Sequence, residues 1–295
     1  MKEPSVSIIL VNYNGSQDTI ECIESVLKCD YKNYNIIVVD NASNDYQELN
    51  NNPVFENEKV ILIRSDENLG FSGGNNIGIK YVSETLPDYV LLLNNDTIVT
   101  KGFLSALVES AKKNKNVGIV TGKILYYWNK DTIWFAGGEY SRKNGRTVHC
   151  KCDMKDDSDT EKKICTFATG CLQLISKDAL QKVGLLSEEY FLYSEDVDYC
   201  CRIIDAGYSI MYDPSCVIYH KVSASTGKNS RMKQYYMMRN EIAIIRKYST
   251  KKRRALFSTY MKYGKRFLKR KLDFYAMRCA IRDAKAGRMG KVDSI

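Results

Sequence analysis

The chain has 295 residues, 44% of them hydrophobic and 27% charged, which is typical of a globular protein and excludes a disordered one. Its net charge of +9 is unevenly distributed: residues 228–295 carry 21 Lys and Arg against four Asp and Glu, whereas residues 1–227 carry 23 against 31. No apolar run approaches the roughly 18 residues that cross a bilayer, so any membrane contact is expected to be peripheral. Because no apolar leader follows Met1 and the ten cysteines lack paired C-x-x-C spacing, we expect a cytoplasmic location with free thiols and no zinc site.

Strands and helices alternate through the first part of the chain. Short apolar runs that end in polar turn residues predict buried strands at Val6–Val11, Ile36–Val39, Val60–Ile63 and Tyr89–Leu93. Helical spacing of apolar residues predicts helices at Gln17–Lys28, about Asn75–Ser83 and Lys101–Lys113. This alternation is typical of a parallel, doubly wound α/β sheet.

The rest of the chain is less regular until its basic end. Strands are predicted at Val117–Val120, Leu172–Ile175, Ser209–Tyr212 and Cys216–Tyr219, with a hairpin between Gly137-Gly138 and Asn144-Gly145 and a charged loop at Asp153–Lys163. Helices are predicted at Lys177–Val183, from the Glu188–Asp198 stretch to Gly207, and at Met232–Tyr248, Lys252–Lys271 and Phe274–Ala286. We therefore expect an α/β domain over residues 1–227 and a basic helical region over residues 228–295.

Acidic residues follow two predicted strands and open one predicted helix: Asp40, Asp96 and the Glu195–Asp198 group. Each has a structural alternative, because Asp favours turns and acidic residues complement the N-terminal end of a helix dipole. Asp96 follows two asparagines, and a single carboxylate binds Mn²⁺ or Mg²⁺ well only when a substrate diphosphate supplies further oxygens. His220, at the end of a predicted strand, is either a further ligand of that metal or a hydrogen-bonded loop histidine.

A glycine-rich stretch, Gly70–Gly78, precedes and enters a predicted helix without matching a dinucleotide or P-loop fingerprint. Glycines at such a place allow a ligand to approach backbone N–H groups, so contact with a base, ribose or phosphate is one interpretation. Tight packing of the helix on a strand is the other, and the sequence does not separate them.

Seven motifs in one order resemble the family 2 glycosyltransferases with a GT-A fold, above all their rhamnosyltransferase-type branch. Spread over roughly residues 5–248, the motifs are VNYNG, VVDNASND, NLGFSGGNN, LLLNNDT, TGCLQLIS, FLYSEDVDYCCR and IYHKVSAS. An ordered series is far more specific than any one motif. The resemblance implies a GT-A type, Rossmann-like and mostly parallel sheet flanked by helices, with a C-terminal helical extension.

The same resemblance implies an inverting, metal-dependent transfer of a sugar, with rhamnose as one candidate, from a dTDP- or UDP-linked donor. The implied acceptor is a hydroxyl of a glycan or polyprenyl-linked molecule in the synthesis of a bacterial surface polysaccharide. Asn94-Asn95-Asp96 matches the D-x-D position, with Asp96 as metal ligand, Asn94 near the ribose and His220 as a second metal or diphosphate contact. Because Asn replaces the first Asp, metal binding without nucleotide is expected to be weak.

Asp196 matches the family's catalytic base, and Glu195 remains open as an alternative for that role. A base must take the acceptor proton on the face opposite the leaving diphosphate, and a helix N-terminus favours its ionised form. Asp40 matches the residue that meets the nucleotide base. The expected nucleotide-sugar-binding residues are Asn12, Tyr13, Asn14, Asp40, Asn68, Gly70, Gly74, Asn76, Asn94 and Asn95.

The basic end of the chain interleaves Lys and Arg with aromatic residues. In the helix predicted at Lys252–Lys271, Phe257, Tyr260, Gly264 and Phe267 share one side and cations surround them. An anionic membrane surface is the partner we expect, on the inner face of the cell membrane, with no nucleic acid. Nucleic-acid binding and plain packing of the aromatics on the α/β domain are the alternatives.

Two other functions compete with glycosyl transfer. A sugar-nucleotide nucleotidyltransferase would need a Gly-rich loop with Arg or Lys after the first strand, where this chain has Asn12-Tyr13-Asn14-Gly15. A catalytically dead scaffold that binds membrane or nucleic acid would not need to retain Asp40, Asp96, Asp196 and His220.

Overall fold

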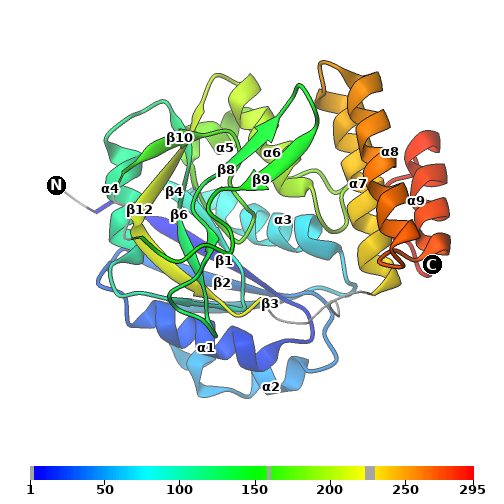
Figure 1. The fold of residues 1–295 in the computed structure, drawn as a ribbon. Coiled ribbons are helices and arrows are strands. Elements are labelled where there is room, and N and C mark those ends of the chain that lie inside the picture. The colour runs from blue at the N-terminus through cyan, green and yellow to red at the C-terminus, as the bar shows by residue number, and fades with distance from the viewer. Residues whose placement is uncertain (1–2, 158–160, 223–229) are drawn as a thin grey trace.

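The computed structural model describes residues 3–157, 161–222 and 230–295. A mixed sheet runs through the molecule with helices on both sides, in the order β10-β12-β6-β11-β4-β1-β2-β3, and β5 and β7 join it through β12 and β6 (Figure 1). Its strands are β1 (Val6–Asn12), β2 (Tyr34–Asp40), β3 (Val60–Arg64), β4 (Tyr89–Leu93), β5 (Thr97–Val99), β6 (Val117–Tyr126), β7 (Ile133–Phe135), β10 (Lys163–Cys165), β11 (Leu172–Ser176) and β12 (Ser209–His220). A separate hairpin pairs β8 (Gly138–Ser141) with β9 (Arg146–His149), as predicted.

Helices cover the sheet and form the C-terminal end of the molecule. The α-helices are α1 (Ser16–Leu27), α2 (Tyr46–Asn50), α3 (Gly70–Val82), α4 (Phe103–Lys112), α5 (Lys177–Val183), α6 (Glu195–Asp205), α7 (Arg231–Tyr248), α8 (Lys252–Leu268) and α9 (Phe274–Ala286). Short 3₁₀ helices span Pro53–Glu56 and Ser83–Thr85. In Figure 1, α1 and α3 lie on opposite sides of the β1–β2 part of the sheet.

The predicted α/β class is confirmed, and the strand directions show where the sheet departs from a purely parallel one. Strands β3, β2, β1 and β4 are parallel, and so are β6 and β12. Strand β11 lies antiparallel between β4 and β6, which the alternation of helices and strands did not predict. The two strands predicted at Ser209–Tyr212 and Cys216–Tyr219 are one strand, β12, whose register shifts between Asp213 and Val217 around Pro214, a residue with no N–H for the ladder.

Helix α3 begins at Gly70, five residues earlier than predicted, so the glycine-rich stretch lies within the helix. A Cβ at Gly74 would lie 2.7 Å from Val11 Cγ1, and one at Gly78 would lie 2.7 Å from Ile9 Cγ2. Both glycines therefore let α3 approach β1 closely. Of the two interpretations left open by the sequence, this geometry supports helix–strand packing at Gly74 and Gly78.

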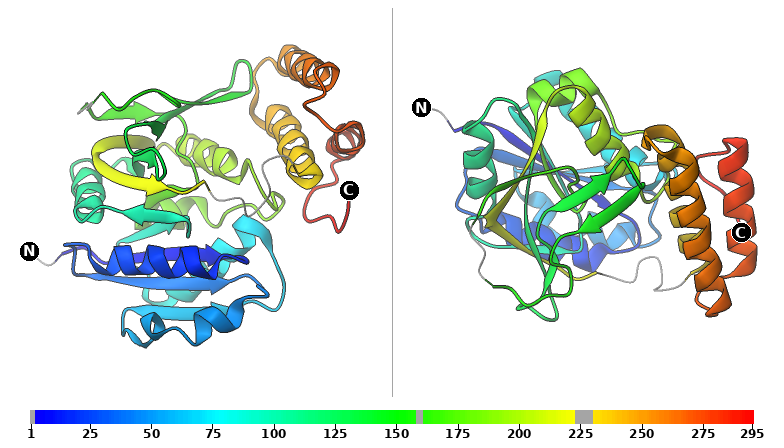
Figure 2. Two further views of the ribbon diagram at one scale, coloured as in Figure 1. Left: turned by 60° about the horizontal axis from the view of Figure 1, so that its bottom comes forward. Right: turned by 45° about the horizontal axis from the view of Figure 1, so that its top comes forward.

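The three C-terminal helices stand side by side at the end of the molecule away from the N-terminus (Figures 1 and 2). Their bounds agree with the predicted ones to within three residues, because caps and a left-handed Gly287 define them: Ser230 accepts from Lys233 N, and Asp273 accepts from Ala276 N. The boundary expected after residue 227 lies outside the described residues. Among the helices that are described, none combines the length and apolar character needed to span a membrane.

Candidate active site

The carboxyl ends of β1, β2 and β4 bring polar side chains into one buried network. Asn12 donates to Asp40 Oδ1 at 2.9 Å and to Ser43 Oγ at 3.0 Å, and it accepts from Thr19 Oγ1 at 2.8 Å. Asn95 Nδ2 reaches the same network, 2.8 Å from Thr19 Oγ1. Parallel strands end at a common edge, which is why residues 28 to 83 positions apart meet here.

Asp96 lies beside His220, with Oδ1 at 3.0 Å from Nε2. The contact arises because β5 follows Asp96 directly and pairs with the end of β12, where Thr97 opposes His220. Trp134 packs its ring edge-on against the imidazole, with centroids 4.5 Å apart, and His220 Nδ1 is buried with no hydrogen-bond partner among the described residues. The imidazole is therefore held in place with its ring orientation set by packing.

A carboxylate oxygen and an imidazole nitrogen this close are donors that Mn²⁺ accepts. The described residues contain no group of three or more His, Cys, Asp or Glu arranged to hold a metal ion. The two donors fit a cation whose remaining ligands come from a diphosphate and water, and they do not fit a cage built by protein alone.

The segment Thr169-Gly170-Cys171 connects this metal-compatible pair to the start of α6. Cys171 O accepts from Asn94 N at 3.0 Å, and Gly170 N donates to Asp196 Oδ2 at 3.1 Å. Asn94 is two residues before Asp96. Two consecutive residues, Gly170 and Cys171, thus link the Asp196 carboxylate to the backbone just before Asp96, 100 positions earlier in the sequence.

The adjacent carboxyls Glu195 and Asp196 differ in exposure. Glu195 is buried and Asp196 is half-buried, so a substrate can reach only the second without movement of the chain. Burial raises the pKa of Asp196 to about 6, and the N–H groups of Gly170 and Val197 oppose that rise. Burial raises the pKa of Glu195 well above its usual range, and the charge of Asp196 raises it further. With a pKa of about 6, Asp196 is mostly ionised at neutral pH, whereas the rise in the pKa of Glu195 favours its protonated form.

The other expected donor-binding residues fall into two groups. Tyr13 and Asn14 are exposed above the Asn12–Asp40 network, and Asn14 N donates to Ser43 Oγ at 3.0 Å. Asn68 closes the turn before α3, where its Oδ1 accepts from Gly70 N at 2.9 Å and from Asn41 Nδ2 at 3.1 Å.

Asn76 lies apart from this edge. It is buried, and its amide donates to Leu186 O and to Glu188 Oε1 and accepts from Leu186 N. These hydrogen bonds tie α3 to the segment around Leu186, and donor contact at Asn76 stays a prediction.

Several residues of the edge had not been singled out from the sequence. Ser43, Thr19 and Asn41 complete the buried network, and Gly170 holds the Asp196 carboxylate. Ser43 and Asn41 lie in the VVDNASND motif and Gly170 lies in the TGCLQLIS motif, so membership of these motifs could have identified them as residues of the site. Thr19 lies in α1 with no local signal, because only the folded register brings it against Asn12.

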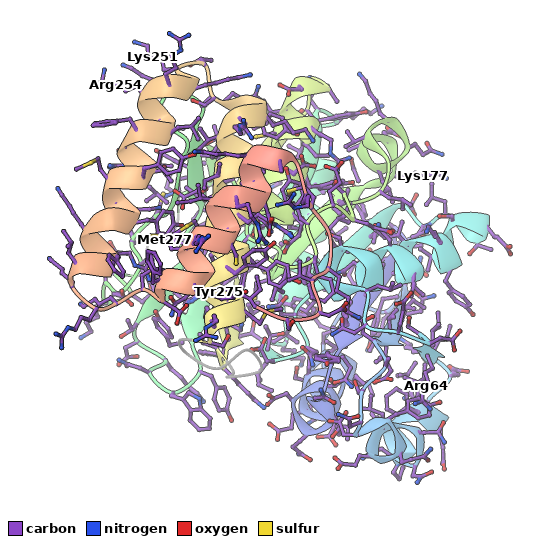
Figure 3. All side chains as sticks on the ribbon, turned by 90° about the vertical axis from the view of Figure 1, so that its right-hand side faces the viewer. Arg64, Lys177, Lys251, Arg254, Tyr275 and Met277 are labelled. Carbon is purple, nitrogen blue, oxygen red and sulfur yellow. The ribbon has the colours of Figure 1, made fainter. Side chains whose placement is uncertain are left out.

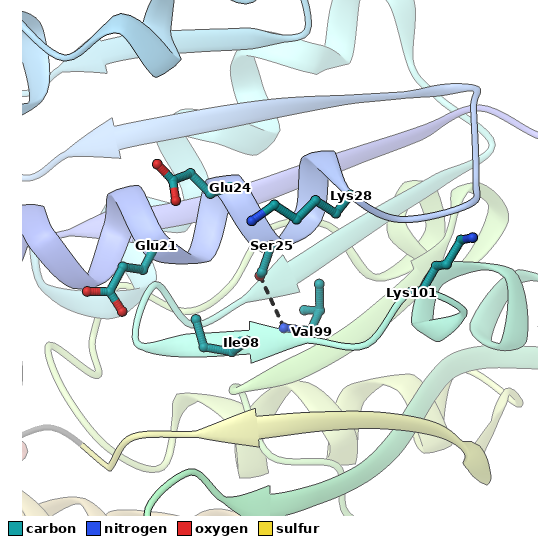
Figure 4. A pocket seen from close by; sticks show the side chains of 7 residues that line it. All are labelled: Glu21, Glu24, Ser25, Lys28, Ile98, Val99 and Lys101. Carbon is teal, nitrogen blue, oxygen red and sulfur yellow. Dashed lines mark hydrogen bonds between the residues drawn. The ribbon is translucent and has the colours of Figure 1, made fainter.

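A separate depression of about 340 Å³ lies between α1 and β5 (Figure 4). Ser25 and Val99 meet at its floor, where Val99 N donates to Ser25 Oγ at 3.1 Å. None of the residues discussed above lines it. Its lining residues are Glu21, Glu24, Ser25, Lys28, Ile98, Val99 and Lys101.

Residues 7–184, more than half of the chain, match the family model described as glycosyl transferase family 2. The chain belongs to glycosyltransferase family 2. Among curated members, it is 25% identical over 256 residues to dTDP-rhamnosyl transferase RfbF of Shigella flexneri, covering 82% of this chain and 80% of the relative. It is 28% identical to the low-salt glycan biosynthesis hexosyltransferase Agl10 of Haloferax volcanii, covering 67% of this chain and 61% of the relative. The poly-β-1,6-N-acetyl-D-glucosamine synthase of Staphylococcus aureus is 26% identical, and the match covers 75% of this chain and 51% of that relative.

Solved glycosyltransferase structures share the fold of this family 2 member. GalNAc-T7 with UDP, GalNAc and Mn²⁺ superposes with a TM-score of 0.66 at 16% identity, covering 83% of this chain and 48% of that one. The mannosyltransferase PcManGT of Pyrobaculum calidifontis, in complex with GDP-Man and Mn²⁺, gives 0.59 at 15% identity, covering 99% and 77%. The GT-A fold and the rhamnosyltransferase-type resemblance expected from the sequence are therefore confirmed.

Proposed function

We propose that this glycosyltransferase moves a sugar, with inversion, from a nucleotide diphosphate donor to a hydroxyl of a glycan or polyprenyl-linked acceptor in the synthesis of a surface polysaccharide. The observation that carries the proposal is the joining of Asp96 and Asp196 at one edge through residues 169–171. A leaving diphosphate and an attacking hydroxyl need these two groups on opposite sides of the sugar. Rhamnose from a dTDP-linked donor is the first candidate, because RfbF is named as a dTDP-rhamnosyl transferase.

On the donor side, Asp96 and His220 would hold Mn²⁺ or Mg²⁺ together with the diphosphate. Such a cation supplies stabilisation of the negative charge that develops on the leaving group. Asn12, Asp40 and Asn95 would support the donor from the buried network, and the exposed Tyr13 and Asn14 would contact it directly. The two solved neighbours contain Mn²⁺ with a nucleotide or nucleotide sugar, in keeping with this assignment.

On the acceptor side, Asp196 would act as the general base. As the acceptor oxygen forms a bond to the anomeric carbon, the bond from that carbon to the diphosphate breaks and the hydroxyl proton passes to Asp196. The carboxylate suits this step because it is ionised at neutral pH and reachable, and a pKa near 6 lies close to the operating pH. Glu195 would not compete for the proton, because it is buried and its raised pKa favours the protonated form.

A ligand screen tests the donor assignment. We expect one nucleotide diphosphate sugar to raise the melting temperature of the protein in the presence of Mn²⁺ or Mg²⁺, since a ligand at 100 times its dissociation constant adds about 2.7 kcal/mol. With acceptor present, the released product should be a nucleoside diphosphate. Release of pyrophosphate from a nucleoside triphosphate would instead indicate nucleotidyl transfer.

We also propose that the enzyme works on an anionic membrane surface, on the inner face of the cell membrane, through the outer side of α8. Residues 252–271 contain nine Lys and Arg and no Asp or Glu. Helix α8 turns Ala255, Thr259 and Tyr263 inward, while Phe257 is 67% exposed and Leu268 is 79% exposed. Figure 3 faces these helices, with Arg254 near the start of α8 and Tyr275 on α9.

This outer side combines cations with large apolar side chains at helical spacing. Its members are Arg254, Phe257, Met261, Lys265 and Leu268. Phe267 extends this side toward α9, because its ring centroid lies 5.6 Å from that of Phe274. Tyr260 and Gly264, predicted on the same side as Phe257, are half-buried. A bilayer with acidic lipids offers negative charge and a hydrocarbon layer together, whereas a nucleic-acid backbone offers the charge without the hydrocarbon.

Vesicle co-sedimentation tests the membrane proposal. We expect binding to vesicles that contain phosphatidylglycerol, weaker binding as salt is raised, and little binding to phosphatidylcholine alone. The double variant Phe257→Ser, Leu268→Ser should bind roughly tenfold or more weakly, because each buried apolar side chain contributes about 1.5–3 kcal/mol. Val148→Ser, at an exposed apolar residue of β9, is the matched control and should bind like the wild type. Equal binding of the wild type and the double variant would remove α8 from the interface.

A further inference from the structure

The segment that leads into α6, residues 189–196, carries the proposed base and has an unusual backbone. Tyr193 and Ser194 are consecutive non-glycine residues in the left-handed region, with φ of 69° and 72°. Non-glycine residues rarely adopt this conformation, and it persists where surrounding contacts hold it in place. Contacts that hold this segment therefore bear on where the Asp196 carboxylate points.

The strongest of those contacts comes from α7, far along the chain. Asn240 Nδ2 donates to Leu192 O at 2.9 Å and to Tyr193 O at 2.7 Å. Its Oδ1 accepts from Arg239 Nε at 2.9 Å, and Asn240 is fully buried. Because Arg239 is only a donor, the Asn240 amide can face the two carbonyls in one orientation alone.

Other groups hold the same region from three sides. Lys247 Nζ and Tyr248 OH, also in α7, each lie 2.7 Å from Asp198 Oδ1, two residues beyond Asp196. From α3, Phe71 N donates to Phe191 O at 2.9 Å. From the C-terminal stretch, Gly290 N donates to Glu189 O at 2.8 Å.

We propose that Asn240 is a positioning residue for the base, an inference that rests on the proposed role of Asp196. Its two hydrogen bonds fix the carbonyls of Leu192 and Tyr193 immediately before α6, and so fix the direction from which the first turn of the helix presents Asp196. One residue of α7 then bears on the position of the base, although the helix follows the expected boundary at residue 227. The buried side chains of α7 agree, because Ile244 packs in the core of the sheet domain while Tyr235 and Ile242 pack in a second core with α9.

Asn240→Asp isolates the donor function. The variant keeps the volume of the side chain and the acceptor for Arg239, but it turns a carboxylate oxygen toward two carbonyl oxygens. We expect kcat to fall by about 10- to 100-fold with the KM for the donor sugar unchanged, since small misplacement of a catalytic group has effects of this size. The acidic limb of the pH profile of kcat should move, and amide hydrogen exchange of residues 192–198 should speed up. Asn240→Ala should show the same pattern without a new charge.

Glu241→Gln is the matched control, because this neighbouring side chain bonds Lys262 and Tyr263 of α8 and does not touch residues 189–196. It should keep the wild-type kcat, pH profile and exchange rates. Folded Asn240 variants with wild-type kcat and pH profile would overturn the inference, and so would an equal loss in Glu241→Gln. Wild-type activity in Asp196→Asn would contradict the proposed base itself, a result distinct from either of these.

Discussion

Replacing the proposed base by its amide, Asp196→Asn, should lower kcat by about 10²- to 10⁴-fold, the range that a positioned general base supplies. The KM for the nucleotide sugar should stay close to the wild-type value, because the proposed role of Asp196 is toward the acceptor. Gly170 N can still donate to the amide oxygen, so the surrounding segment should keep its structure. Initial rates of sugar transfer at saturating donor measure the effect.

The dependence of kcat on pH gives a second, independent test of the role of Asp196. Since the pKa of Asp196 is raised to about 6 and the base must be ionised, kcat should be flat above that pH and fall tenfold for each pH unit below it. The variant should lose this acidic limb.

Glu195→Gln is the control, because burial and the charge of Asp196 raise the pKa of Glu195 and so favour the protonated acid, which a glutamine resembles. It should retain activity within a few-fold of the wild type. If Glu195→Gln is inactive and Asp196→Asn is active, the roles of the two carboxyls are reversed.

Most helices and strands of the fold could be predicted from the local sequence, because the hydrophobic pattern of a few residues is enough to identify each of them. Buried parallel strands such as Val6–Asn12 and Tyr34–Asp40 are continuous apolar runs, and α7 and α9 begin after the capping residues Ser230 and Asp273. The antiparallel insertion of β11 is different in kind. Whether Leu172–Ser176 pairs with β4 in one direction or the other depends on the path of residues 127–171, whose described part contains no helix to set a crossover.

Residues of the candidate site could be predicted where a polar residue ends a strand. They could not be predicted where their role depends on a contact between segments far apart in the sequence. Asp40 ends β2 beside the end of β1, so its contact with Asn12 follows from parallel-sheet geometry, whereas the contact of Asp96 with His220 depends on the antiparallel pairing of β5 with β12. Asn240 gave no such signal, since it lies in a basic helix and its partners are backbone carbonyls 47 and 48 positions earlier. The glycine-rich stretch left two interpretations open in the sequence, and the close approach of Gly74 to Val11 that supports helix–strand packing is visible only in the folded chain.

Removing Asp96, the proposed metal ligand, should abolish the effect of metal on nucleotide binding. In the wild type, Mn²⁺ should strengthen the affinity for the donor's nucleoside diphosphate, and Asp96→Asn should weaken the metal-supported affinity by at least about 100-fold, since even outer-shell changes at metal sites cost 10- to 100-fold. His220→Ala should have the same direction and a smaller effect, because imidazole loss leaves the charged ligand in place. Titration calorimetry with and without Mn²⁺ measures both variants without relying on turnover.

The predicted weakness of the site in the absence of nucleotide makes this test specific. Only Asp96 and His220 supply donors from the described chain, so Mn²⁺ alone should bind poorly even to the wild type, and metal and diphosphate should bind cooperatively. Asp131→Asn removes one carboxylate from an exposed position beyond β6 and should leave both affinities unchanged, which separates ligation from a general loss of negative charge. A chelator that leaves nucleoside diphosphate affinity intact, or an Asp96→Asn variant that still responds to Mn²⁺, would show that the cation binds elsewhere. Asp96 would then be left with the role that its contact with His220 already gives it, fixing β5 against the end of β12.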